Sequence, residues 1–176
     1  MNARGYSPAE PSLRHRGLKR RRRCSCRRGR ILIVDDAPCY RELVKTILQH
    51  FLRIRVTAAA TSRQALAVAR HRRFDLVISD IARPNDMDGL TFLRLFKRHH
   101  PHIPVLIASG NSDSVNRYEA FWSGAYAFLP KPFSFEELLA AVRQGLQGAA
   151  ECRKLRLRAR CSQEIRCNGG TEFPIR

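Results

Sequence analysis

The chain has 176 residues, 44% of them hydrophobic, which is enough for one domain with a buried core. Its formal net charge is +18 at pH 7, from 33 lysines and arginines against 15 acids. No apolar run is long enough for a membrane helix, and "ILIV" after the basic segment is too short for a secretion signal. We therefore expect a cytoplasmic protein that has no membrane partner.

The positive charge is concentrated at the two ends. Residues 1–30 contain 11 lysines and arginines against one acid, residues 31–150 contain 15 against 11, and residues 151–176 contain 7 against 3. Blocks of like charge typically form solvated arms, so we predict a basic N-terminal arm at 1–29, a folded domain at 30–148 and a basic tail at 149–176. The tail is shorter than the roughly 40 residues that a domain usually needs, so we expect no output domain there. We favour a frayed tail over an extension of the last helix.

The basic ends leave open a weak interaction with nucleic acid. "LKRRRRCSCRRGR" is able to neutralise phosphates without sequence preference, but it has no interleaved aromatic residues on which bases would stack. The six cysteines are expected to be reduced thiols. A zinc site built from Cys24, Cys26 and the tail cysteines is a weaker alternative, because the chain lacks paired CxxC spacing.

From Ile31 onward, short apolar runs alternate five times with longer segments of helical period. We predict strands at 31–34, 53–60, 75–79, 104–109 and 127–130, and helices at 41–51, 62–72, 89–100, 113–124 and 134–146. Leu43, Ile47 and Leu48 are predicted to share the buried face of the first helix. This order of elements predicts an α/β fold, a flavodoxin-like doubly wound sheet of five parallel strands in the order 2-1-3-4-5 with five helices.

Five polar residues follow or end the predicted strands. Asp35 and Asp36 follow the first strand, Asp80 the third and Lys131 the fifth, while Ser109 ends the fourth. Ligands of open α/β sheets bind beyond the carboxyl ends of the strands, so we expect these side chains to lie close together. The alternative is that each is an ordinary turn or helix-cap residue, as Asp36 and Asp88 would be if they cap the helices that follow them.

Three carboxylates at one site need counter-charge, because each pair repels by about 4 kcal/mol at about 4 Å and an effective dielectric of about 20. Lys131 and a divalent cation would supply it, and Mg²⁺ suits an open site made of oxygen ligands. A carboxylate can then act as the nucleophile that accepts a phosphoryl group. We predict Asp80 as acceptor, Asp36 as main metal ligand, Asp35 as second acid, Lys131 as counter-ion and Ser109 as hydroxyl donor.

The motifs "ILIVDDAPCYRELV", "DLVISDIARPNDMDGL", "PVLIASG" and "GAYAFLPKPF" together resemble the receiver domain of bacterial two-component response regulators, over roughly 30–148. The resemblance includes an arginine five residues after the acid pair, Arg41. It implies that a histidine kinase or a histidine phosphotransfer protein donates a phosphoryl group to Asp80 in the presence of Mg²⁺. It also implies that the backbone carbonyl of Ala82 joins Asp35, Asp36 and Asp80 as a metal ligand.

The resemblance further implies a conformational switch in which Ser109 moves inward and Phe128 follows it, changing contacts with a downstream protein target. Phe128 as an ordinary core residue is the alternative. Such a domain is not an enzyme, apart from self-catalysed phosphorylation and dephosphorylation. Phosphatases with an aspartate nucleophile normally carry a second acid two residues later, where this chain has Ala82.

Three positions depart from the family pattern. Arg83 stands where the family usually has Met, Gly110 where it usually has Ala, and the loop before Gly89 has one extra residue, Asn85 or Asp86. We expect Arg83 either to reach toward the acids or to point to solvent. A second class of function also stays open, a basic nucleic-acid-associated protein that uses a receiver-like core as a scaffold.

Overall fold

The computed structural model describes residues 29–83, 86–110 and 114–167, with the backbone alone at 114–115 and 158–167. The strands are β1 (Arg30–Val34), β2 (Arg55–Ala59), β3 (Leu76–Ser79), β4 (Val105–Ser109) and β5 (Ala127–Pro130). The helices are α1 (Pro38–Leu52), α2 (Ser62–His71), α3 (Gly89–His99), α4 (Ser114–Trp122) and α5 (Phe135–Cys167). The strands are parallel and lie in the order β2-β1-β3-β4-β5. The predicted flavodoxin-like doubly wound sheet is confirmed.

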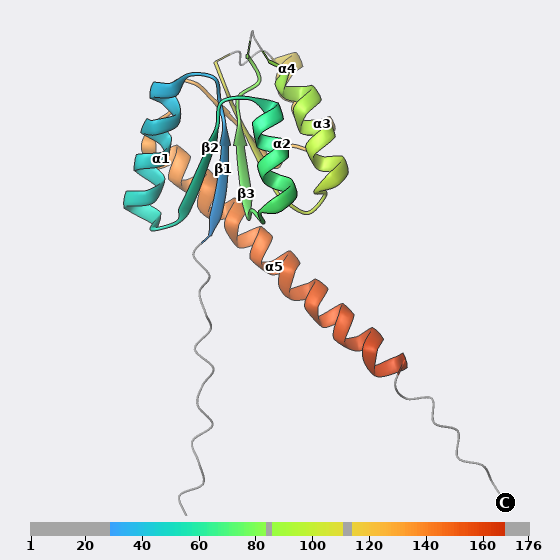
Figure 1. Ribbon diagram of the computed structural model, residues 1–176. Helices are drawn as coiled ribbons and strands as arrows, with labels where there is room; N and C mark the ends of the chain where they lie inside the picture. The colour runs from blue at the N-terminus through green and yellow to red at the C-terminus, as the bar shows by residue number, and fades with distance from the viewer. Residues whose placement is uncertain (1–28, 84–85, 111–113, 168–176) are drawn as a thin grey trace, which may run out of the picture.

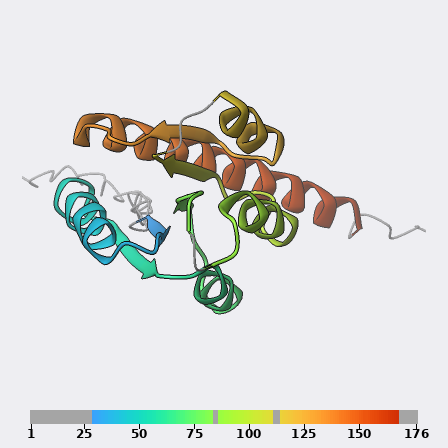
Figure 2. The same cartoon turned by 90° about the horizontal axis from the view of Figure 1, so that it is seen from above.

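The sheet lies between two layers of helices, as Figures 1 and 2 show from two directions. Along β1, Ile31 and Ile33 belong to the core cluster under α1 and α5, while Leu32 and Val34 belong to the cluster under α2, α3 and α4. All four are at most 1% exposed. A strand covered on both faces needs apolar residues at every position, which is why "ILIV" does not alternate with polar residues.

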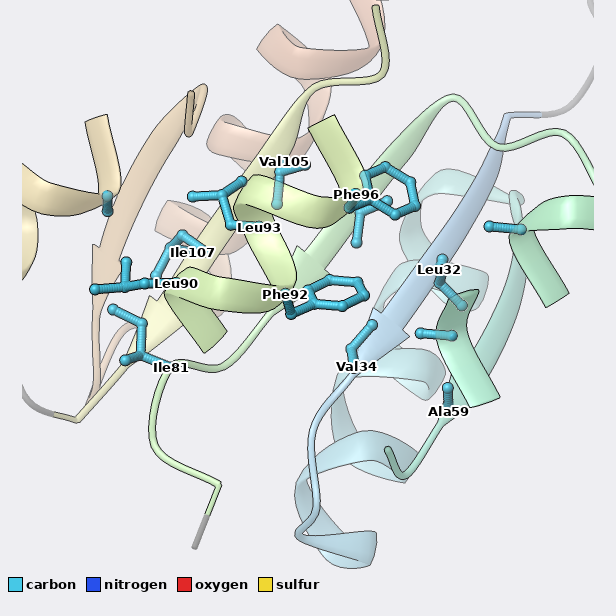
Figure 3. Close-up of a cluster of buried hydrophobic side chains, with 14 of the residues drawn as sticks. Leu32, Val34, Ala59, Ile81, Leu90, Phe92, Leu93, Phe96, Val105 and Ile107 are labelled. Atoms are coloured by element: carbon cyan, nitrogen blue, oxygen red, sulfur yellow. The ribbon is translucent and has the colours of Figure 1, made fainter. Parts of the chain in front are cut away.

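Figure 3 shows the core cluster on the α3 side of the sheet. Phe92 and Phe96, four residues apart on α3, are fully buried, and their rings lie 5.6 Å apart between centroids. Burial of each such side chain contributes about 1.5–3 kcal/mol to stability. The cluster therefore fixes α3, and with it the loop that joins β3 to α3, against the sheet.

Local signals in the sequence start the helices. Pro38 occupies the first turn of α1, where its missing N–H costs no hydrogen bond. Before α5, Ser134 and Glu137 form a reciprocal capping box, with the Glu137 N–H donating to Ser134 Oγ at 3.1 Å and the Ser134 N–H donating to Glu137 Oε2 at 2.8 Å. Asp88 caps α3, because its Oδ2 accepts from the Thr91 N–H at 3.1 Å.

Two expectations for the helices are wrong. Leu43 is 56% exposed, whereas Val44 and Leu48 face the core, because residues four apart share a helical face and Leu43 is turned about 100° from Val44. The tail after Gly148 is not frayed up to Cys167: α5 runs through 33 residues to that position, as Figure 1 shows where it continues past the sheet. The residues beyond Gly148 are rich in Arg, Leu and Ala, which favour helix.

Other expectations fall on parts of the chain that are not described. The basic arm up to residue 28, Cys24, Cys26 and the side chains of Cys161 and Cys167 lie outside the described residues. Cys39 and Cys152 are exposed free thiols. In the part of the chain that the structure describes, no helix is both long enough and apolar enough to span a bilayer.

Candidate functional site

The ends of β1 and β3 bring two of the predicted acids together. These strands are neighbours with Val34 opposite Ser79, so the next residues, Asp35 and Asp80, emerge side by side at the carboxyl edge of the sheet. The Asp80 N–H donates to the Val34 carbonyl at 3.0 Å, which extends the ladder to the acceptor candidate itself. Asp35 is 2% exposed and Asp80 is 8% exposed.

Lys131 joins these two carboxylates. It follows β5, and its Nζ lies 2.8 Å from Asp35 Oδ2 and 2.7 Å from Asp80 Oδ2. Its backbone N–H donates to the Ser109 carbonyl at 2.8 Å, which ties the lysine to the end of β4. Hydrogen bonds between charged groups are about twice as strong as neutral ones, and here one ammonium offsets part of the charge of two buried carboxylates.

Backbone N–H groups hold the remaining carboxylate oxygens in place, and a side-chain donor holds the backbone of Asp35. The Ala37 N–H donates to Asp35 Oδ1 at 2.9 Å, and the Ala82 N–H donates to Asp80 Oδ1 at 3.2 Å. Arg41 Nη1 donates to the backbone carbonyl of Asp35 at 2.6 Å. Each acid is thus oriented from two sides, which limits its rotation at the site.

Tyr40 is a member of the site that the sequence analysis missed. Lys131 Nζ lies 3.8 Å from the centroid of the Tyr40 ring, a cation–π contact. Burial, and then the charges of Asp35 and Asp80, raise the pKa of Tyr40, so the phenol stays neutral. The only signal in the sequence is an aromatic residue in the first turn of the helix that follows the acid pair.

The other predicted residues are placed differently. Asp36 is exposed. Ser109 is fully buried at the end of β4. Phe128 is 8% exposed and belongs to the core cluster that also contains Ile107, so its role in a switch stays a prediction.

The donor atoms suit a hard cation, although they form no closed cage. Among the described residues, no group of three or more His, Cys, Asp and Glu side chains is arranged to hold a metal ion. Lys131 bridges two of the three predicted carboxylates, and the third, Asp36, is exposed and follows Asp35 in the chain. Carboxylate oxygens have two lone pairs each, and oxygen ligands with open positions for water and phosphate are what Mg²⁺ prefers.

Arg83 takes neither of the two directions expected for it. It is 4% exposed and points toward the first turn of α2, where its Nη2 donates to Ser62 Oγ at 2.9 Å. It also donates from Nη1 to Ser79 Oγ at 3.1 Å and from Nη2 to the Met87 carbonyl at 3.2 Å. Its guanidinium carbon lies 5.4 Å from the centroid of the Phe92 ring.

Asp86 is the ion-pair partner of this buried arginine. Its Oδ2 lies 3.3 Å from Arg83 Nε and accepts from the Ser62 N–H at 2.6 Å. Partial burial alone would raise the pKa of Asp86, but the hydrogen bonds from Ser62 and the charge of Arg83 lower it overall. Burial lowers the pKa of Arg83, while Asp86 and then Asp80 act in the opposite direction. The pair fastens the loop after Asp80 to the start of α2.

Gly89 closes this loop against the end of β3. A Cβ at this position would lie 2.4 Å from the Asp80 carbonyl oxygen and 2.4 Å from Ile81 Cα, which only glycine avoids. The Gly89 N–H donates to the Ile81 carbonyl at 3.1 Å. The start of α3 therefore touches the backbone of the acceptor candidate directly.

A doubly wound sheet whose carboxyl edge carries buried aspartates bridged by a lysine defines a class of α/β proteins that bind ligands at this edge. The family model described as the response regulator receiver domain matches residues 31–143. The chain belongs to this family: residues 31–143 form a receiver domain, the phosphoacceptor module of two-component response regulators. In sequence it is 33% identical over 119 residues to the DNA-binding transcriptional regulator NtrC of Salmonella typhimurium, and 40% identical over 121 residues to the transcriptional regulatory protein ZraR of Escherichia coli O157:H7.

These matches cover 68% and 66% of this chain but only 25% and 26% of the two regulators. In structure it is similar to the chemotaxis response regulator CheY4 of Vibrio cholerae, with a TM-score of 0.62, 32% identity, and coverage of 68% of this chain and 99% of CheY4. The receiver domain of NtrX from Brucella abortus gives a TM-score of 0.64 at 34% identity, covering 66% of this chain and 98% of that domain.

Proposed function

We propose that Asp80 is the phosphoacceptor, and that a histidine kinase or a histidine phosphotransfer protein is the donor. The observation that carries this proposal is the position of Lys131 Nζ, 2.7 Å from Asp80 and 2.8 Å from Asp35. An Asp80 carboxylate oxygen attacks phosphorus, an O–P bond forms, and the P–N bond to the donor imidazole breaks as that imidazole takes up a proton. Lys131 then has a phosphoryl oxygen as its new partner, which offsets the charge that arrives.

Mg²⁺ completes the charge balance in this proposal. The carboxylates of Asp35, Asp36 and Asp80 and the backbone carbonyl of Ala82 would hold it. When bound, it neutralises charge on the phosphoryl oxygens. Ala82 also occupies the position two residues after the acceptor. Its methyl side chain has no group that could activate water, so it does not promote hydrolysis of the acyl phosphate.

Signalling in this proposal passes from Ser109 to Phe128. Both are buried, and they lie on the neighbouring strands β4 and β5, where Ile107 pairs with Phe128 and Ser109 with Pro130. A shift of the Ser109 hydroxyl toward the phosphoryl group opens space that the Phe128 ring fills. This changes the surface formed by α4, β5 and α5, which a downstream protein target reads.

The test is intact-mass measurement after incubation with a small acyl phosphate and Mg²⁺. We expect one added phosphoryl group on the full chain, none on Asp80→Asn, and none when the metal is chelated. Asp88→Asn is the matched control, because Asp88 caps α3 in the same loop and should leave the modification unchanged. An unchanged mass for the wild type, or an added phosphoryl group on Asp80→Asn, would refute the assignment.

A further inference from the structure

A basic cavity lies at the opposite end of the sheet from Asp80. Its volume is about 990 Å³, and it is lined where the strands begin, by Arg30 of β1 and Arg55 of β2. The end of α2, the connection from α3 to β4 and one face of α5 complete the lining. Figure 1 shows α5 passing the lower edge of the sheet and continuing beyond it. We call this cavity the amino-edge cavity.

The charge of the amino-edge cavity is strongly one-sided. Seven arginines and one acid, Asp75, are among the described residues that line it, so its charge comes from the arginines. Asp75 is already engaged, since it pairs with Arg153 through one oxygen and accepts from the Arg30 N–H at 2.9 Å through the other. Arg70, Arg72 and Arg73 stay exposed at its rim. Positive charges gathered in a concave site attract anions, just as the carboxylates at the other edge attract cations.

We propose that this cavity binds the phosphodiester backbone of a nucleic acid without sequence preference. This inference does not rest on the assignment of Asp80, because the two sites lie at opposite ends of the strands. The guanidinium group of arginine matches phosphate oxygens with two parallel hydrogen bonds, and it stays charged at every physiological pH.

The extent of the basic surface favours a long polyanion over a single phosphate or a nucleotide. Ala149, Cys152, Arg153 and Arg156 line the cavity at spacings of three, one and three residues, which places them on one face of α5. Seven residues of helix span about 10 Å, which corresponds to about three phosphates along one strand of duplex DNA.

The first strand, β1, begins beside this cavity. Arg30 lines the cavity, and seven of the ten residues at 19–28, just before Gly29, are Lys or Arg. Among the described lining residues, Phe74 alone has a Phe, Tyr or Trp ring, and it is 5% exposed, so none of them offers such a ring for base stacking. Contacts to phosphates without contacts to bases give binding that tolerates any sequence.

The experiment compares two triple variants of the full chain that lose the same charge. Arg70→Gln, Arg72→Gln and Arg73→Gln together alter the rim of the cavity. Arg63→Gln, Arg117→Gln and Arg143→Gln together alter exposed arginines elsewhere. Fluorescence anisotropy with labelled duplex DNA and with single-stranded RNA of equal length, over a series of salt concentrations, gives the affinity and its salt dependence.

We expect the rim variant to bind at least about tenfold more weakly than the control variant, and its slope of log affinity against log salt to fall by about 2 to 3. A loss on DNA alone or on RNA alone identifies the nucleic acid that is bound, and a loss on both supports the proposal equally. The urea midpoint of unfolding should be the same in both variants, which verifies that the fold is intact. If the rim triple does not fold, Arg72→Gln and Arg73→Gln singly should each lower the slope by about 1.

Three results overturn the proposal. The first is equal loss of affinity in the two variants, which would mean that net charge or the basic arm binds without the cavity. The second is an absence of binding by the wild type at low salt. The third is displacement of the nucleic acid by polyglutamate at equal charge concentration, which would identify an acidic protein segment as the occupant.

Discussion

Removing the Asp86 carboxylate should destabilise the domain far more than removing Arg83, although the two residues form one ion pair. The Arg83 side chain is 0% exposed, and its Nε lies 3.3 Å from Asp86 Oδ2. In Asp86→Ala the guanidinium stays buried without this counter-charge, a change that typically costs about 3–5 kcal/mol. The Ser62 N–H also loses its acceptor at 2.6 Å. For a domain of this size we expect a fall in Tm of about 10–20 °C.

Arg83→Met behaves differently because it removes the buried charge together with its desolvation cost. The variant loses the hydrogen bonds to Ser79, Ser62 and Met87, but Met fills much of the same space with apolar atoms. The Asp86 carboxylate that remains is 13% exposed and keeps the hydrogen bond from the Ser62 N–H, so we expect a smaller loss than for Asp86→Ala, about 2 kcal/mol. The double variant should be little worse than Arg83→Met alone, which gives a coupling energy of about 2 kcal/mol or more between the two positions.

Urea unfolding at pH 7 measures both effects, provided that the slope with denaturant stays constant across the cycle. The pKa of Asp86 is lowered from its ordinary value of 3.8, so its stabilisation is complete above that value and is lost as the pH falls through the folded-state pKa. The gap between wild type and Asp86→Ala should therefore narrow below about pH 4. A loss under about 1 kcal/mol for Asp86→Ala, or additive single losses in the cycle, would refute the reasoning.

Two further predictions concern the loop and the lysine. Gly89→Ala should unfold at a clearly lower urea concentration than wild type, because its Cβ would lie 2.4 Å from backbone atoms of Asp80 and Ile81. Gly110→Ala is the control, and its unfolding midpoint should be unchanged because a Cβ there would have nothing within 4 Å. Equal midpoints for the two variants would contradict the close packing of Gly89. Lys131→Met should slow phosphorylation by a small acyl phosphate by about 10²-fold, since one charged donor to the transferring oxygens is lost. Intact-mass measurement of samples quenched at successive times follows this rate, and a rate within twofold of wild type would exclude a direct role for the lysine.

The pattern of the chain was sufficient for the fold and for the acids that end its strands. "ILIV" and "VLIAS" are apolar without interruption because both faces of the sheet are covered, and that pattern is local enough to see in the letters. Since every strand is parallel, the residue after each strand must lie at one edge. The proximity of Asp35, Asp80 and Lys131 follows from that rule, and their distances agree with it.

The directions in which individual side chains point could not be predicted from the sequence. Arg83 turns to Ser62, 21 residues away, because the energy of a buried guanidinium depends on every partner around it and not on its neighbours in the chain. The ring of Tyr40 under Lys131 and the exposure of Leu43 are decided in the same way, by which face of α1 meets the sheet.

Length, charge pattern and strand ends thus determined from sequence alone that this protein contains a doubly wound α/β domain with acids at the carboxyl edge of its sheet and basic residues concentrated at the ends of the chain. The tertiary structure decided where the basic residues meet. Arg30, Arg72 and Arg153 are separated by 42 and 81 residues, and no local pattern indicates that they border one cavity. The strands of a parallel sheet all begin at one edge, so the fold brings the residues at the strand starts together there, as it brings the acids together at the other edge. The contribution of α5 to this cavity follows only from how α5 packs across that edge.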